Sequence, residues 1–216
     1  MANVVNPNGF SVLTSRVGGA NTGQDNWYYI PQTDTSQYGI GDMVKVAAGG
    51  DANGVPAVQK AIGGSNIEWL RGVIVGVAPT PSIGTPSLIG TPLALEITNI
   101  PATKTQGYYV LVNDDPNTVY EIQDDGLAVL TAAACNKNAQ FTVVNPTAPL
   151  QNSATVMQTS AAGGGSAPQP TATFPLKILG LVLRQSPAGG NGFGAYARWM
   201  VKINTHDLSA SGVVGV

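Results

Sequence analysis

The feature that most constrains this chain is the shortness of its apolar runs. Throughout residues 27–203 these runs are a few residues long, and turn residues separate them. The 216 residues include 27 glycines and 15 prolines, which favour turns and interrupt helices. Roughly ten short strands at this spacing fit an all-β fold better than an α/β fold. We therefore predict an all-β single domain, either a jelly roll, a β-sandwich or a barrel-like fold.

Three segments carry clear strand patterns. Residues 68–77 place mostly bulky side chains at odd positions, and glycines such as Gly72 at even positions, where another backbone could approach. Residues 176–183 are apolar on both faces apart from one lysine, as in a central strand covered on both sides. Residues 197–203 alternate between apolar and polar side chains, which predicts a half-buried strand.

Residues 108–123 have the clearest hairpin pattern. Alternating side chains flank a turn at residues 113–117, where Pro116 supplies the fixed φ of a type I turn. We expect the two strands to pair, with one face in the core and the other facing solvent.

The remaining segments suggest an arm, a helix and two long loops. Residues 1–26 lack periodicity and predict an extended N-terminal arm, which leaves residues 27–216 as the β-rich domain. The alanines of residues 126–138 favour one short helix. The Pro-rich residues 79–92 and the Gly-rich residues 160–173 predict long loops, of which the second should be flexible.

The charge content is low and balanced. Ten Lys and Arg residues against twelve Asp and Glu residues give a net charge of −2, and charged residues make up only 10% of the chain. Ordinary soluble domains have about 25%. The basic residues are scattered, so we expect no direct binding to nucleic acid. A surface this poor in charge suggests contact with other subunits.

The cysteine content and the N-terminal residues bear on the compartment in which the protein folds. Cys135 is the single cysteine, so no intrachain disulfide can form, and we expect its thiol to be buried and inert. The N-terminal residues lack the pattern of a signal peptide, and no apolar run is long enough for a membrane span. We expect a protein that stays in the cytoplasm during assembly and does not bind membranes.

The sequence contains few signals of catalysis. The single histidine, His206, precedes Asp207, but neighbouring strand residues point to opposite faces and make no dyad by spacing. Motifs of the HExxH, CxxC and GxSxG types are absent. The glycine-rich stretches lie in loops and lack a P-loop lysine. We therefore expect a protein that is not an enzyme and has no cofactor and no catalytic or metal-binding residues.

Two features admit a functional interpretation beside a structural one. Five of the twelve acidic residues lie within residues 114–125, which predicts a solvated turn, with a calcium site as the alternative. Trp27, Tyr28 and Tyr29 are consecutive and cannot all face one core. At least one should lie at a subunit interface, where such residues are enriched, or form a sugar-stacking platform.

Several segments resemble a family of tailed-phage virion proteins. Residues 108–123 read YYVLVNDDPNTVYEIQ and are similar to the family pattern YVLVADDPxxxFEIQ. Residues 176–182 and 196–206, LKILGLV and YARWMVKINTH, resemble its closing segment LKILGLV…YAKWLVKINNH. The motifs NPNGF at 6–10, YYIP at 28–31 and GVIVGV at 72–77 occur in the family's order.

This resemblance implies a capsid decoration or cement protein on the outer capsid surface of a virion. Its partners would be the major capsid protein and further copies of itself, as a dimer or trimer. The candidate interface comprises Phe10, Trp27, Tyr28, Tyr29, Tyr196 and Arg198. The alternatives are a carbohydrate-binding protein of the virion, a structural component of the tail or baseplate, and, with least support, a hydrolase.

Overall fold

A computed structural model describes residues 3–15, 25–64, 68–78, 99–146, 152–161, 166–184 and 190–209. Within these ranges the chain forms strands and one short 3-10 helix, η1 (Ala132–Ala134). The strands are β1 (Ser11–Ser15), β2 (Asn26–Ile30), β3 (Tyr38–Gly39), β4 (Met43–Gly50), β5 (Pro56–Lys60), β6 (Leu70–Ala78), β7 (Asn99–Ile100), β8 (Tyr108–Asn113), β9 (Thr118–Gln123), β10 (Asn138–Ala139), β11 (Phe141–Thr142), β12 (Val156–Met157), β13 (Leu176–Leu181) and β14 (Arg198–Ile203).

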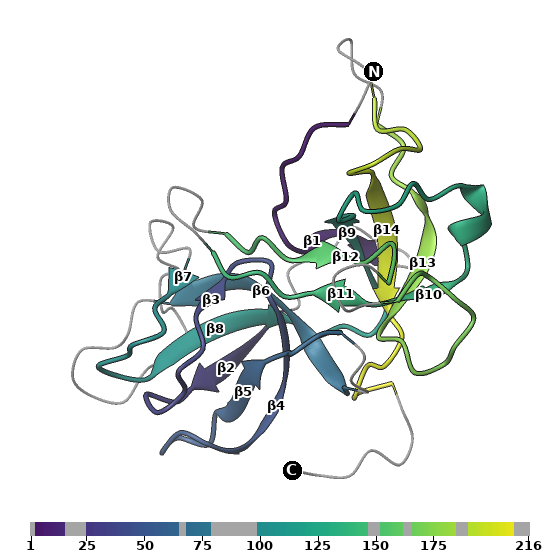
Figure 1. Ribbon diagram of the computed structural model, residues 1–216. Coiled ribbons are helices and arrows are strands. Elements are labelled where there is room, and N and C mark those ends of the chain that lie inside the picture. Colours follow the sequence, from purple (N-terminus) through teal and green to yellow (C-terminus); the bar gives the residue numbers. More distant parts are fainter. Residues whose placement is uncertain are drawn as a thin grey trace.

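Five strands close into a barrel in the order β2-β5-β4-β6-β8, shown at lower left in Figure 1. Pairing is antiparallel except between β2 and β5, which meet in parallel at Tyr29 and Ala57. Gly72 is needed on β6, because a Cβ there would lie 2.1 Å from the carbonyl oxygen of Asn113. The prediction that this glycine face admits another backbone is confirmed. The barrel is filled by a cluster that includes Ile30, Val44, Ile74 and Val112.

The second half is a five-stranded antiparallel sheet in the order β1-β9-β14-β13-β10. It lies at the right in Figure 1, with the two-stranded pair β11–β12 beside it. Strand β14 shows the predicted alternation, since Trp199, Val201 and Ile203 are buried and the residues between them are half-buried. Strand β13 is internal to the sheet as predicted, but its outer face is only half-covered.

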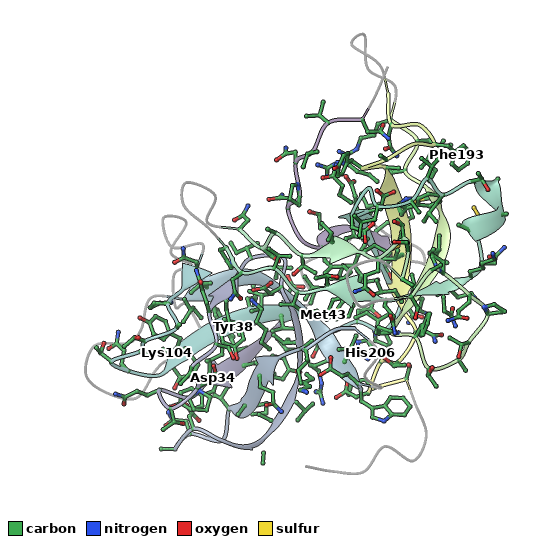
Figure 2. All side chains as sticks on the ribbon, viewed as in Figure 1. Asp34, Tyr38, Met43, Lys104, Phe193 and His206 are labelled. Carbon is green, nitrogen blue, oxygen red and sulfur yellow. The ribbon has the colours of Figure 1, made fainter. Side chains whose placement is uncertain are left out.

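One hydrophobic core joins the two halves. Met43 of β4, with Leu70 and Val73 of β6, belongs to the same cluster as Trp199 of the second sheet. The start of β6 also forms a parallel bridge between Leu70 and His206. Figure 2 shows Met43 and His206 between the barrel and the second sheet. The prediction of an all-β single domain with a barrel-like or sandwich-like fold is confirmed.

The predicted hairpin at residues 108–123 is wrong. Strands β8 and β9 follow each other in sequence but do not pair: β8 lies between β2 and β6 in the barrel, and β9 lies between β1 and β14 in the second sheet. The turn between them therefore carries the chain from one half to the other. Every residue of β9 is buried because partners cover both of its faces, so neither face of this strand is solvated.

The predicted helix at residues 126–138 is also wrong. Only η1 is helical, and Thr131 caps its start by accepting a hydrogen bond from the Ala133 amide. The turn ends at Asn136, which has a positive φ of 65° and donates its backbone N–H to Ile178. The chain then forms β10 at the sheet edge, so pairing with β13 overrides the helical preference of the alanines.

The N-terminal residues are more than an arm. Residues 11–15 form β1 at the edge of the second sheet, and Phe10 is buried in its core. Residues 3–10 are free of regular structure, but Asn6 is hydrogen-bonded to Gln123 of β9 and to Arg198 of β14. The prediction that residues 1–26 stand apart from the β-rich body is therefore wrong for the described residues 3–15. These residues are ordered because β1 pairs with β9, and the sequence of residues 1–26 has no strand pattern that would predict this pairing.

The predicted loops lie partly or wholly outside the described residues. The segment 79–92 lies outside them, as does the centre of the Gly-rich segment, residues 162–165. Residues 166–173 are held in place, since the backbone groups of Gln169 and Asn138 exchange two hydrogen bonds of 2.9 and 3.0 Å. Among the described residues, none of the helical structure has the length and apolar content to cross a membrane.

Candidate binding surfaces

Two of the six residues predicted for an interface are buried in the monomer. Phe10 is only 2% exposed and packs edge-on against Tyr120 and Phe141, with ring centroids 6.2 and 5.6 Å away. Tyr28 is 4% exposed and points toward the barrel interior. The interface prediction is wrong for both residues, because the core takes up their rings.

The neighbours of Tyr28 point the other way. On β2, alternation places Trp27 and Tyr29 on the outer face of the barrel, where both are half-buried against Val55 and Tyr109. Trp27 lines an open pocket of about 480 Å³ between β2 and the turn from β4 to β5. The prediction that the three consecutive aromatic residues cannot share one core is confirmed.

Tyr196 and Arg198 are both engaged within the molecule. Arg198 Nη1 donates to Glu121 Oε1 at 2.9 Å, and Nη2 donates to the carbonyl oxygen of Asn6 at 2.8 Å. The ring of Tyr196 covers Gly126, where a Cβ would lie 2.4 Å from a ring carbon. These residues fix the N-terminal segment and the loop after β9. Both are half-buried, so their contact with a partner stays a prediction.

A buried polar network links the barrel to the C-terminal segment. Tyr28 donates its hydroxyl to Asp114 Oδ2 at 2.6 Å and accepts a hydrogen bond from Arg71 Nη1 at 3.0 Å. Arg71 also binds Asp207, with an Nη2–Oδ2 distance of 2.6 Å. Burial, with the Asp114 carboxylate, raises the pKa of Tyr28 to about 12, so this hydroxyl keeps its proton and acts as a donor.

The acidic cluster is not the solvated turn that the sequence predicted. Asp114, Glu121 and Asp124 are buried, and each has internal partners. Glu121 is bound by Arg198 and by Arg184, the latter at 2.5 Å. Among the described residues, no group of three or more His, Cys, Asp or Glu side chains could hold a metal ion.

Asp124 is the most deeply placed of these acids. Its Oδ2 accepts the indole N–H of Trp199 at 3.0 Å, and its Oδ1 accepts the backbone N–H of Gly126 at 3.0 Å. Burial raises its pKa to about 6, although these donors oppose the shift. Asp124 thereby connects the core tryptophan of β14 to the loop after β9.

His206 and Asp207 do not form a catalytic pair. His206 Nδ1 lies 3.6 Å from Asp207 Oδ1 and accepts instead the backbone N–H of Leu208 at 3.2 Å. This arrangement leaves the ring proton on Nε2, which is buried and has no hydrogen-bond partner among the described residues. Burial lowers the pKa of His206, so the ring is neutral at physiological pH. Asp207 is instead paired with Arg71.

The single cysteine lies at the edge of the core. Cys135 is a free thiol that is half-buried and packs against the hydrophobic cluster of the second sheet. It was predicted to be buried, and the burial is only partial.

An exposed apolar surface lies at the end of the second sheet. Three segments meet there, because Asn3 Nδ2 donates to the carbonyl groups of Gly192 and Ala195, and Gln123 Nε2 donates to those of Val4 and Tyr196. The side chains exposed on these segments are Val4 (77%), Val5 (57%), Leu127 (56%) and Phe193 (52%). We call these four residues the apolar end.

Figure 2 shows Phe193 at the end of the molecule opposite the barrel residues Tyr38 and Lys104. Sequence reasoning missed the apolar end because its residues follow no strand period. A usable signal was present in Phe193, an aromatic residue between Gly192 and Gly194, in a loop that no core pattern includes. Its ring leans on Trp199, with centroids 5.9 Å apart.

The fold and these surfaces define an all-β protein in which Asp114, Glu121 and Asp124 have internal partners and four of the exposed apolar side chains form the apolar end. Comparison with family models, with curated proteins and with solved structures finds no match to this chain.

Proposed function

We propose that this chain is a non-enzymatic structural protein of a tailed-phage virion. It binds the outer surface of the capsid and stabilises the shell by bridging neighbouring capsomers. The resemblance of residues 108–123 and 196–206 to virion proteins supplies the class of particle. The observation that carries the proposal is the apolar end.

The apolar end has the properties of a protein-binding surface. Its four side chains are each more than half exposed, and they come from segments that are held together by side-chain hydrogen bonds. Contiguous exposed apolar residues on a folded domain mark interaction sites. The low content of charged residues, 10%, also favours a surface that is covered in an assembly.

The partner that we propose for the apolar end is the major capsid protein. Strand β1 follows the N-terminal segment and lies at the edge of its sheet in the order formed by the described strands. A capsid strand could add there through backbone hydrogen bonds, which need no charged side chains. Self-association as a dimer or trimer would multiply such contacts, and linked weak contacts gain from a high effective concentration.

The polar clusters support a structural role. Asp114, Glu121 and Asp207 each bind neighbouring side chains that hold strands or loops in place. These three carboxylates therefore serve as structural contacts. We propose that they fix the body of the protein, so that the apolar end is presented in a constant shape.

The experiment measures binding of purified protein to capsids that lack it. Replacement of both Val4 and Val5 with serine should weaken co-sedimentation by about tenfold or more, because central apolar contacts dominate interface energy. The matched control is Ile62→Ser, which changes a side chain that is 64% exposed on the loop after β5. This control should bind like the parent protein.

The melting temperatures of both variants should stay within about 3 °C of the parent, since exposed side chains contribute little to stability. Binding should also persist at raised salt, because screening acts on charges that are few here. Equal binding by the parent and the Val4/Val5 variant would remove the apolar end as the contact surface. Failure of the parent protein to bind capsids would contradict the proposed function.

A further inference from the structure

The pocket beside Trp27 has the composition of a small-ligand site and plays no part in capsid binding as proposed above. It is lined by Asn26, Trp27, Tyr28, Asn53, Gly54, Val55 and Pro56 and holds about 480 Å³. One wall is the start of β2, and the other is the turn between β4 and β5. Both walls belong to the closed barrel, so the pocket is formed before any ligand arrives.

The aromatic wall is held in place from behind. Trp27 packs against the cluster of Val55 and Tyr109, together with Tyr29. The rings of Tyr29 and Tyr109 are 5.5 Å apart and tilted, and they pack against each other. Neither lines the pocket, so Trp27 is the lining aromatic residue of the outer face. A supported indole offers a flat apolar surface at little entropic cost.

The opposite wall is an ordered turn. Asp51 Oδ1 accepts the backbone N–H groups of Asn53 and Val55, both at 2.8 Å, and its Oδ2 accepts the hydroxyl of Tyr109 at 2.5 Å. Gly54 has a positive φ of 84°, which this turn requires. The position of Asn53 at the rim is thereby fixed.

Neutral hydrogen-bonding groups surround the aromatic wall. Asn26 Nδ2 is bound to Asp114 at 2.9 Å, and Asn53 Nδ2 is bound to Asp51 at 3.2 Å. Among the described residues, the side-chain oxygens of these two asparagines and the indole N–H of Trp27 have no partner. The pocket therefore offers two acceptors and one donor beside a flat ring.

The charges near the pocket select the class of ligand. None of the seven lining residues has a charged side chain, and the charged residues that are hydrogen-bonded to them, Asp51, Asp114 and Arg71, are also engaged with one another or with other groups. An anionic ligand would meet no cationic side chain among these lining residues. A pyranose ring presents an apolar face of C–H groups and a rim of hydroxyls, which matches an indole flanked by amide oxygens.

We propose that this pocket binds a neutral saccharide, with one sugar ring stacked on Trp27 and its hydroxyl groups bound to Asn26 and Asn53. A proline-rich peptide fits less well, because it requires successive aromatic ridges, and here Tyr29 and Tyr109 do not line the pocket. The inference is independent of the capsid contact, since the pocket lies on the barrel and the apolar end lies on the second sheet.

The test follows the indole N–H signal of Trp27 in a nitrogen-15 correlation spectrum. The probes are cellotetraose, maltotetraose and triacetylchitotriose, with sialyllactose and a proline-rich decapeptide for comparison. At least one neutral oligosaccharide should shift the Trp27 signal in a saturable way. Trp27→Ala and Asn53→Ala should each weaken its binding by about tenfold or more, as expected for a central aromatic residue and for a fixed hydrogen-bonding group.

The matched control is Trp69→Ala, which removes an indole that is 44% exposed and does not line the pocket. This variant should bind the saccharide like the parent protein. Asn53 is exposed, so its variant keeps the test valid if loss of Trp27 impairs folding. The proposal is overturned if no neutral oligosaccharide shifts the signal, if Trp69→Ala causes the same loss, or if only sialyllactose or the peptide binds.

Discussion

The hydroxyl group of Tyr28 on β2 lies 2.6 Å from Asp114 Oδ2, at the point where the chain leaves the barrel for the second sheet. Arg71 of β6 binds the same hydroxyl, and Asp207 near the end of β14 binds Arg71. A single phenol therefore connects two strands of the barrel, the turn between the halves and the C-terminal segment.

Replacement of Tyr28 with phenylalanine tests this connection. The change leaves Asp114 and Arg71 each short of one buried hydrogen bond, which should lower the free energy of unfolding by about 1–3 kcal/mol. Chemical denaturation measures the effect. The control is Tyr29→Phe, because the Tyr29 hydroxyl makes no hydrogen bond with the described residues, and this variant should lose less than about 0.5 kcal/mol. Equal losses would show that the network contributes nothing specific.

The second prediction concerns Phe10, whose burial in the core shows that the N-terminal segment is not a detachable arm. Phe10→Ala should cost about 3–5 kcal/mol, the usual loss for a phenylalanine removed from a packed core. Leu13→Ala, at a side chain that is 36% exposed, should cost about 1 kcal/mol or less. For the same reason, deletion of residues 1–15 should unfold the second sheet. A deletion variant with unchanged stability would show that β1 and Phe10 are dispensable.

The third prediction concerns the close approach of β6 and β8. Gly72→Ala places a Cβ 2.1 Å from the Asn113 carbonyl oxygen, so the barrel must shift or lose pairing. We expect a loss of about 1–3 kcal/mol in unfolding free energy, typical of overpacking. At Gly192 no atom lies within 4 Å of an added Cβ, and Gly192→Ala should be nearly neutral. Thermal melts of the two variants should therefore differ clearly.

The fourth prediction concerns the pH dependence of stability through Asp124. Its pKa is raised from 3.8 to about 6 in the folded protein, so protonation favours folding. The stabilising contribution is complete below about pH 3.8 and is lost as the pH rises through 6. Asp124→Asn cannot titrate, so its unfolding free energy relative to the parent should rise by about 2 kcal/mol between pH 4 and pH 7.

Comparison with the Asn variant cancels the contribution of His206, which has the opposite sign. The pKa of that histidine is lowered, so its contribution is present above about pH 6.5 and is lost as the pH falls. A difference between parent and Asp124→Asn that stays constant from pH 4 to pH 7 would contradict the raised pKa.

Local pattern was sufficient to predict strands but not their partners. The alternation at residues 197–203 led to β14, because burial on one face leaves a period of two in the sequence. The same kind of pattern at residues 108–123 gave two correct strands and a wrong pairing. A turn of this length can close a hairpin or move the chain to another sheet, and the contact that decides, between Tyr28 and Asp114, spans 86 residues.

The candidate surfaces were harder to predict for a related reason. Phe10 was assigned to an interface because its own segment has no period, yet its ring is covered by Tyr120 and Phe141, which are distant in sequence. Acidic residues near a turn suggested solvent, whereas Glu121 meets Arg198 only after β9 and β14 pair. Such burial depends on tertiary contacts that leave no local signature. Trp27 was predictable, since three consecutive aromatic residues cannot all point inward.

The most direct measurement of the central proposal is the location of the chain in purified virions. Because the proposed function places the chain in a tailed phage, virions that contain it would be separated into heads and tails, and the chain quantified in each fraction by mass spectrometry. We predict that it is found with the heads in a fixed ratio to the major capsid protein, and that heads lacking it lose integrity at a lower temperature. Recovery of the chain only with tails, or with neither fraction, would contradict the proposal, and recovery with tails would favour a tail or baseplate component instead.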